Sequence, residues 1–524
     1  MTDLLPPPGV FGLPEKFKSW RLAQPKAILE LVDSQERFIV QIQPTGSGKS
    51  LCYITGAILI NGRTLILTSL KGLQRQIMSD FGDLGITLVM GRSSYRCAVR
   101  PVSAEWGPCR LGSYCYKKHE GGCPYYDAIA NAKKSKIVVT NYAFWHSNKP
   151  GVLGEFDLLV CDEAHNAVSH LIDSLSTGLT KKEVQSFGYN YLGREDDPWV
   201  WVSTLRDRLK GDMKSRIDSI GSRIANASVD VLKAHVRLLN KLDNLVGRDS
   251  KQWVVDYFTD RVDFDPIWPP EFAEKMLFRG IPKILLTSAT MGHSTLRMLG
   301  IDDDSDHRVT EYPSDFPIDR RPIYHVPTAR MDHRIDNLGY GLWCNRIDQI
   351  ISTRLDRKGI IHTVSYDRRN RIRNVSEFAE FFYHHDTKGI QEALEKFGLA
   401  SPPAILVSPS VVTGWDFPYQ KCEYQIIGKI PFPDQRRKVD KVRKERDPDW
   451  GCCLAMQNLV QACGRGMRYR DDQCENIIID DHFTWFVRKY AKFAPKWFLG
   501  AVRMERTIPK PPQPLEGVVG EHII

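Results

Sequence analysis

Residues 43–50 (QPTGSGKS) have the composition of a phosphate-binding loop. The glycines allow backbone N–H groups to wrap phosphates, Lys49 can reach the β- and γ-phosphates of a nucleotide, and Ser50 can ligate Mg²⁺. Gln43 stands where such loops usually begin with glycine. A chance glycine-rich turn before a helix is the alternative, but an apolar strand precedes the loop and an acidic motif follows it. We therefore predict nucleotide binding here.

The acidic motif, residues 162–165 (DEAH), follows an apolar run. Asp162 can hold Mg²⁺ directly or through water, and Glu163 can polarise the attacking water in phosphoryl transfer. His165 can couple the site to another domain. An isolated Asp-Glu pair is usually a solvated helix start, but its register with the strand and with Lys49 favours a hydrolytic role.

Residues 461–468 (QACGRGMR) add two guanidinium groups. On a helix, Gln461, Arg465 and Arg468 lie at i, i+4 and i+7 and so share one face. Such guanidinium groups suit bidentate contact with a triphosphate, in the role of arginine fingers. A solvated basic face is the alternative. Two glycines within the segment argue against an ordinary helix interior.

Four cysteines, Cys97, Cys109, Cys115 and Cys123, lie between the phosphate loop and the acidic motif with the spacing C-x11-C-x5-C-x7-C. Four thiolates can hold a [4Fe–4S] cluster or a structural Zn²⁺. Structural zinc sites usually contain close C-x2–4-C pairs, and this spacing has none, which favours the cluster. Lys117 and Lys118 lie among tyrosines in the same segment, a composition that suits single-stranded nucleic acid.

The elements that must position these residues are short apolar runs followed by polar residues. Each run is predicted to be a buried parallel strand, and ligands of open α/β sheets bind beyond the carboxyl ends of such strands. Their number favours two doubly wound units over one. The runs are residues 38–42, 64–67, 137–139, 158–161, 284–286, 359–362, 404–407, 425–427 and 476–479.

Residues 166–279 interrupt this alternation and are predicted to be mostly helical. Apolar side chains recur every three or four residues from Leu205 to Ile224 and again from Val229 to Leu245. Two long amphipathic helices packed on each other would bury both stripes.

The bulk composition is that of an ordinary globular chain with a net charge of +9, which is compatible with a nucleic-acid partner. No run of about 18 apolar residues suggests a membrane span, and residues 1–10 do not resemble a signal peptide. We therefore expect an intracellular protein whose twelve cysteines are thiols or metal ligands. If bacterial or phage-encoded, it would be cytoplasmic and nucleoid-associated; if eukaryotic, it would be nuclear.

Taken together, the motifs resemble those of the superfamily 2 helicases, specifically the iron–sulfur branch typified by XPD and DinG. The resemblance spans nearly the whole chain, in the order of that family. It rests on residues 43–50, 68–74, 91–97, 162–165, 287–290 (TSAT), 414–416 (GWD) and 461–468. It implies ATP- and Mg²⁺-dependent 5′→3′ translocation on single-stranded DNA, two RecA-like domains with ATP between them, and a [4Fe–4S] cluster.

The resemblance also implies roles for individual residues. Arg21 and Gln24 match an upstream element on the adenine side, and Asp416 matches a motif near the nucleotide. The phosphate loop contributes Thr45, Gly46, Ser47, Gly48, Lys49 and Ser50. The expected contacts to DNA phosphates are Thr68, Lys71, Gln74, Asn141 and Tyr142, with Lys117 and Lys118 from the cysteine segment.

The expected architecture is α/β, with two RecA-like motor domains and two insertions in the first. Residues 1–91, 128–165 and 281–312 would form the first motor domain, and residues 313–524 the second. Residues 92–127 would be the iron–sulfur module, and residues 166–280 a helical arch. Expected partners are single-stranded, forked or tailed duplex DNA, with a protein loading partner left open. We expect a monomer without membrane association.

Two alternatives stay open at this point. The first is an ATP-driven translocase or remodeller that moves on nucleic acid without unwinding it, which a short arch would allow. The second is a DNA-binding accessory subunit without catalysis, against which the intact Lys49, Asp162, Glu163 and Arg468 argue.

Overall fold

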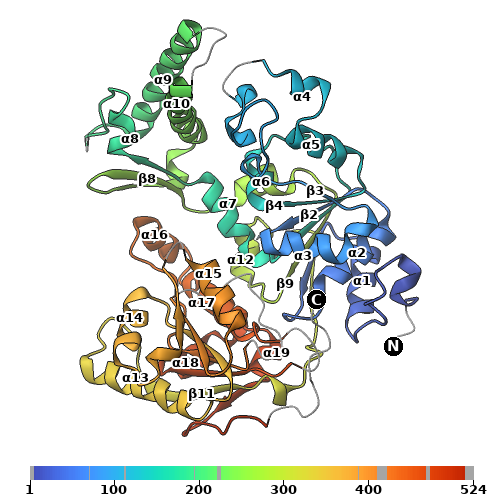
Figure 1. Ribbon diagram of the computed structural model, residues 1–524, viewed down its shortest axis with the longest axis vertical. Helices are drawn as coiled ribbons and strands as arrows, with labels where there is room; N and C mark the ends of the chain where they lie inside the picture. Colours follow the sequence, from blue (N-terminus) through green and yellow to red (C-terminus); the bar gives the residue numbers. More distant parts are fainter. Residues whose placement is uncertain are drawn as a thin grey trace.

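Two parallel β-sheets of seven strands each form the two lobes of the molecule (Figure 1). The computed structural model describes residues 5–69, 71–110, 114–193, 195–220, 226–386, 389–409, 422–467 and 472–513. Among the described helices, none has both the length and the apolar character needed to cross a bilayer.

The five central strands of the first sheet are apolar and buried on both faces, as a parallel sheet covered by helices requires, and its two edge strands are partly exposed. Its order is β10 (His307–Glu311), β1 (Phe38–Ile42), β9 (Lys283–Ser288), β5 (Leu158–Asp162), β2 (Thr64–Thr68), β4 (Ile137–Asn141) and β3 (Thr87–Leu88). The covering helices include α1 (Gln24–Asp33), α2 (Lys49–Ile60), α3 (Lys71–Phe81), α5 (Pro124–Lys134) and α6 (Tyr142–Ser147). All five strands predicted in this half are confirmed.

The second sheet repeats this plan. Its order is β13 (Phe382–His384), β14 (Ala404–Ser408), β12 (Lys358–His362), β15 (Tyr424–Ile427), β16 (Glu475–Asp480), β11 (Ile323–Ala329) and β17 (Val502–Met504). Its helices include α13 (Asn337–Ser352), α14 (Tyr366–Val375), α15 (Ile390–Leu399), α17 (Trp450–Cys463), α18 (His482–Tyr490) and α19 (Lys496–Leu499). All four predicted strands are confirmed, and two doubly wound units are therefore correct.

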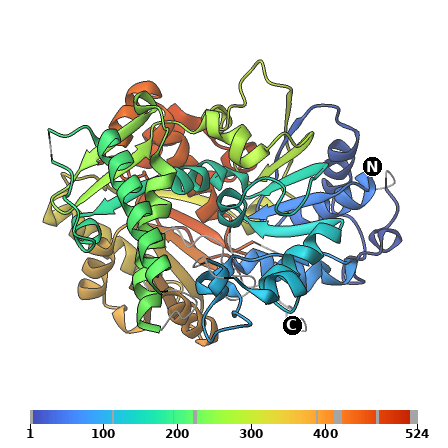
Figure 2. The ribbon, with the colours of Figure 1, turned by 90° about the horizontal axis from the view of Figure 1, so that it is seen from above.

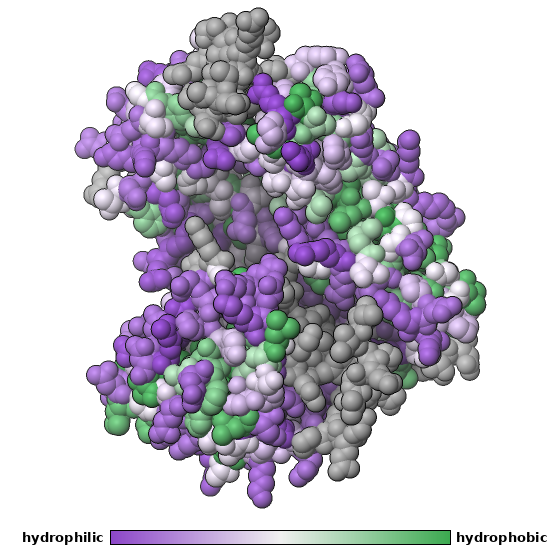
Figure 3. Space-filling view, in the orientation of Figure 1, coloured by the Kyte–Doolittle hydropathy of each residue, from purple (hydrophilic) through white to green (hydrophobic). Residues whose placement is uncertain are grey.

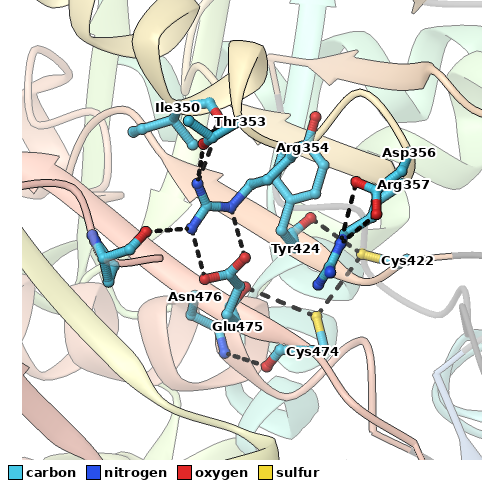
Figure 4. Close-up of polar contacts among 11 residues, drawn as sticks. Ile350, Thr353, Arg354, Asp356, Arg357, Cys422, Tyr424, Cys474, Glu475 and Asn476 are labelled. Atoms are coloured by element: carbon cyan, nitrogen blue, oxygen red, sulfur yellow. Dashed lines mark hydrogen bonds and ion pairs between the residues drawn. The ribbon is translucent and has the colours of Figure 1, made fainter. Parts of the chain in front are cut away.

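A fully buried ion pair ties the second sheet to the segment after α13 (Figure 4). Arg354 Nε and Nη2 donate to the two carboxylate oxygens of Glu475 at 2.6 and 2.8 Å. The same guanidinium donates to the Pro509 carbonyl at 3.0 Å, so the C-terminal segment is held on this domain.

The insertion between β5 and β9 is mostly helical, as predicted, but it also contains a small sheet that was not predicted. The two predicted long helices, α9 (Pro198–Ile220) and α10 (Asn226–Leu245), lie side by side (Figures 1 and 2). Below them is an antiparallel sheet of β6 (Thr177–Thr180), β8 (Arg261–Pro266) and β7 (Trp253–Tyr257). Residues 261–265 alternate charged and apolar side chains, a pattern that is typical of a strand and that the prediction did not use. Helix α7 (Ala167–Leu175) joins this insertion to the first domain.

The insertion contacts both the cysteine segment and the second domain. On one side, the Arg237 guanidinium of α10 lies 4.7 Å from the ring centroid of Trp106. On the other side, α16 (Lys438–Arg446) of the second domain packs on β7 and β8. Figure 3 shows a recess between the upper and lower parts of the molecule on one face.

The contact with α16 is both apolar and ionic. Val439 packs with Val254 and Ile267 of the insertion. Arg443 Nε and Nη2 donate to the carbonyl oxygens of Ile267 and Pro266 at 2.9 and 2.7 Å. The insertion is thus held at both ends, and the chain forms a closed ring of contacts.

Candidate active site at the interface of the two domains

The phosphate loop connects β1 to α2 and turns sharply at Gly46 and Gly48, whose φ angles are 75° and 79°. These left-handed conformations favour glycine. Gln24 Nε2 donates to the Ser47 carbonyl at 2.9 Å, and Arg21 Nη1 donates to the Gly46 carbonyl. The two upstream residues therefore contact the backbone of the loop itself.

The acidic motif begins at the carboxyl end of β5. Asp162 is buried, and both of its carboxylate oxygens are hydrogen-bonded: Oδ1 accepts from the Glu163 N–H at 2.9 Å and Oδ2 from the Tyr53 hydroxyl at 3.2 Å. Burial, together with the charge of Glu163, raises the pKa of Asp162 to about 6. The carboxylate of Asp162 and the hydroxyl of Ser50 are the oxygen donors that Mg²⁺ prefers, so the chemistry of the pair fits the ion.

Glu163 adopts a φ of 49°, a left-handed conformation that a residue with a side chain adopts at an energetic cost. Its carboxylate lies 3.8 Å from Lys49 Nζ and 3.3 Å from His165 Nδ1. The site thus brings together the amine predicted to bind phosphate and the carboxylate predicted to orient water.

His165 connects three motifs. Its Nδ1 lies 2.7 Å from Ser288 Oγ and 3.5 Å from Gln461 Nε2 of the second domain. Burial lowers the pKa of His165 to about 4, so the ring is neutral at pH 7 and its contact with Glu163 is not an ion pair. The Nδ1 atom thus has a hydroxyl of the first domain and an amide of the second domain as neighbours, so the ring links the two domains.

The second domain reaches the phosphate loop through the turn after α17. A Cβ atom on Gly464 would come within 2.0 Å of Thr45 Oγ1, and one on Gly46 within 2.4 Å of the Met467 carbonyl oxygen. Only glycine allows the two backbones to approach so closely. A narrow cavity beside this contact is lined by both domains, including Pro44, Thr45, Arg321, Gly464 and Trp497.

The prediction that Gln461, Arg465 and Arg468 share one helical face is wrong in part. Helix α17 ends at Cys463, so Arg465 lies on the turn beyond it, as the two glycines of the segment require. Arg465 is nevertheless buried in the interface; burial lowers its pKa, and the nearby charge of Glu163 opposes that effect. Arg468 and Asp416 lie outside the described residues.

The cysteine segment brings two of its four thiols close together. A Cβ on Gly107 would lie 3.2 Å from Cys97 Sγ and 3.9 Å from Cys109 Sγ. Cys115 and Cys123 are buried, at the starts of α4 (Tyr116–Glu120) and α5. Within the described ranges, no three His, Cys, Asp or Glu side chains are arranged as a metal site. Four thiols are suitable ligands for an iron–sulfur cluster, and the convergence of all four on one cluster stays a prediction.

The candidate nucleic-acid contacts differ in exposure. Lys71 and Lys118 are exposed, and Lys117 is half-buried. Thr68, Gln74 and Tyr142 are buried; Gln74 lies inside α3, and the Tyr142 hydroxyl donates to the Asp162 carbonyl at 3.1 Å. Asn141 Oδ1 accepts from the Phe144 N–H and so caps α6.

Sequence reasoning missed two features of this site. One is Tyr53, which lies one helical turn after Ser50 but whose contact with Asp162 arises only in the tertiary structure. The other is Ser288, which the sequence places only within residues 287–290 of the family resemblance and which contacts His165.

Comparison with known proteins agrees with this arrangement. The family profile described as DEAD/DEAH box helicase matches residues 21–187, and the profile described as helicase C-terminal domain matches residues 351–500. No curated protein matches the sequence.

Solved structures share the fold across almost the whole chain. A structure titled "XPD_Helicase" has 13% sequence identity and a TM-score of 0.62, with 92% of this chain and 98% of that chain covered. The structure titled "Structure of S. tokodaii Xpd4" has 14% identity and a TM-score of 0.59, with 93% and 100% covered.

Proposed function

Because this chain is an XPD/DinG-like superfamily 2 helicase in its fold and in its two helicase domains, we propose that it uses ATP to move 5′→3′ along single-stranded DNA and to separate duplexes. It would act as a monomer on forked or tailed duplexes, in the cytoplasm or the nucleus according to its host.

One observation supports ATP-driven motion above all others: the hydrolytic residues of the first domain meet side chains of the second. Gln461 contacts His165, which lies beside Glu163. Arg465 is buried close enough to Glu163 for that negative charge to favour the charged guanidinium. A change in the nucleotide at Lys49 would therefore alter contacts that hold the two domains together. A nucleotide can drive a conformational cycle only if it interacts differently with the open and closed arrangements of the two domains.

Each residue has a defined task in this cycle. Lys49 and the N–H groups of the phosphate loop would bind the phosphates, and Ser50 and Asp162 would hold Mg²⁺, which neutralises charge on the β- and γ-oxygens. Glu163 would orient the attacking water. Arg465 would stabilise the charge that develops on the transferred phosphoryl group.

The ring of contacts supports a path for one DNA strand. Cationic Arg237 lies at the junction of the insertion and the cysteine segment; the exposed Lys118 belongs to that segment, and the exposed Lys71 donates to its Ser94 at 3.4 Å. A strand passing there would meet positive charge, which binds phosphates without reading sequence. The two strands of the duplex would separate at the entrance to this path, because only one strand passes through it.

We extend the proposal to a [4Fe–4S] cluster held by Cys97, Cys109, Cys115 and Cys123. The support is the proximity of two thiols around Gly107 in a segment with little apolar core of its own. When bound, the cluster would cross-link this segment. Anaerobically purified protein should contain about four irons per chain, and Cys109→Ser should lose them, whereas Cys344→Ser in α13 should not. Stoichiometric zinc with negligible iron would overturn this part.

Strand displacement from duplexes with a 5′ or a 3′ single-stranded tail tests the function. We expect displacement from the 5′-tailed substrate only. Glu163→Gln should bind nucleotide but neither hydrolyse ATP nor displace a strand. Hydrolysis stimulated by single strands without displacement from either tail would favour the translocase, and activity unchanged in Lys49→Ala would contradict an ATP-driven function altogether.

A further inference from the structure

Tyr53 is a buried tyrosine on α2 that touches both candidate Mg²⁺ ligands. Its hydroxyl oxygen lies 3.2 Å from Ser50 Oγ and 3.2 Å from Asp162 Oδ2. The side chain is almost completely buried, at 1% exposure. The two ligands come from different elements, α2 and β5, and one phenol joins them.

The direction of these hydrogen bonds follows from their partners. An ionised carboxylate can only accept, so the single Tyr53 proton points to Asp162. The Ser50 hydroxyl must then donate to the Tyr53 oxygen. This arrangement directs the Ser50 proton to Tyr53, so the Ser50 lone pairs stay available, and it leaves lone pairs free on Asp162 Oδ2. Both oxygens are thus in the state in which they can ligate a cation.

We propose that Tyr53 is a positioning residue for the metal of the nucleotide site, one that aligns Ser50 and Asp162 before Mg²⁺ and nucleotide bind. This inference rests on the proposed function, because it assigns Ser50 and Asp162 to the metal. It adds a partner that touches neither nucleotide nor metal but orients two groups that do. Partners of this kind typically contribute 10- to 100-fold to metal affinity.

A purely structural role for the Tyr53 hydroxyl makes a different prediction. If it only satisfied a buried polar group, its loss would lower stability but leave the affinity for metal unchanged. Tyr312 provides the matched comparison. It is also a buried tyrosine of the first domain, and its hydroxyl donates to the Glu30 carboxylate, away from the phosphate loop.

The test measures Mn²⁺, a paramagnetic stand-in for Mg²⁺, binding to the full chain in the presence of ADP and without nucleic acid. In Tyr53→Phe we expect the Kd for Mn²⁺ to rise about 10-fold or more, while the Kd for ADP without metal stays within about twofold and thermal unfolding shows a folded protein. Tyr312→Phe should bind Mn²⁺ as the wild type does. In hydrolysis assays, Tyr53→Phe should need more Mg²⁺ for half-maximal rate.

Three results would overturn the inference. They are an unchanged Kd for Mn²⁺ in Tyr53→Phe, an equal rise in Tyr312→Phe, and an undiminished effect of Tyr53→Phe in a Ser50→Ala background, where its coupling to Ser50 is gone. If Tyr53→Phe unfolds at the assay temperature, the Kd values are compared below its unfolding midpoint, with Tyr312→Phe measured at the same temperature. If the wild type itself fails to bind Mn²⁺ with ADP, the proposed function fails as well, which distinguishes the two failures.

Discussion

Replacing Arg443 by methionine should release the inserted arch (residues 166–280) from the second domain. Arg443 is buried, and its guanidinium donates to two carbonyl oxygens at the end of β8 and lies 3.3 Å from the carboxylate of Asp440. Methionine fills a similar volume but leaves those carbonyls and that carboxylate without their donor.

The expected cost follows from these contacts. A hydrogen bond to a charged group is worth about 1.5–3 kcal/mol, and removal of one partner of a buried ion pair costs about 3–5 kcal/mol. We expect the contact between α16 and the arch to weaken by about 3–5 kcal/mol, which corresponds to about 10²- to 4 × 10³-fold more opening.

Hydrogen exchange measures this opening locally, which suits a protein of several domains. The amides of β7 and β8 should exchange at least about 10²-fold faster in Arg443→Met, with the two parallel sheets unchanged. Arg443→Lys should be intermediate, since one ammonium group lacks the fork geometry that reaches both carbonyls. Lys444→Met, an exposed neighbour on the same helix, is the control.

A change below about tenfold in β7 and β8 would refute the reasoning, because it would mean that α16 does not hold the arch. Under the proposed function, Arg443→Met should also reduce strand displacement more than ATP hydrolysis.

Three further outcomes follow from the structure. Gly464→Ala should reduce ATP hydrolysis at least about tenfold, because its Cβ would lie 2.0 Å from Thr45 Oγ1, whereas Gly211→Ala in the exposed part of α9 has open space and should stabilise its helix by about 0.5–1 kcal/mol in thermal unfolding. Asp480 accepts from the N–H groups of Met331 and Ile430 and from His482, and these contacts hold its pKa below the usual range despite burial. Its stabilisation is therefore fully present above pH about 4 and declines as the pH falls through the folded-state pKa, so Asp480→Asn should lower unfolding stability more at pH 7 than at pH 3. Arg354→Met should destabilise the second domain by about 3–5 kcal/mol, and adding Glu475→Leu should recover most of it, as denaturant unfolding can show; an additive loss would contradict the ion-pair account.

The nine predicted strands are correct because strands of a parallel sheet covered on both faces read as continuous apolar runs. Most strands that sequence reading missed lie at sheet edges or in the arch. The exception is β11 (Ile323–Ala329), which is paired on both sides but whose apolar run is interrupted by a proline and polar residues. Thr87–Leu88 and Val502–Met504 are too short and too exposed to form such a run. In the arch, Arg261–Pro266 alternates charged and apolar residues, and the long helical stripes beside it dominated the interpretation.

The site shows a similar division. Lys49, Ser50, Asp162 and Glu163 could be named from local motifs because phosphate binding and water activation need particular side chains at short spacing. Tyr53 could not, because its role depends on the Asp162 carboxylate more than a hundred residues further along the chain, which only the packing of α2 on β5 brings within hydrogen-bonding distance.

The sequence by itself determined two doubly wound units, the nucleotide chemistry and the set of four thiols, since each depends on local pattern or residue type. Only the tertiary structure decided that Gln461 contacts His165, that Gly464 faces Thr45, and that the arch is held by α16. These contacts join residues from separate domains, and their geometry depends on how two independently packed cores meet, which no local pattern encodes.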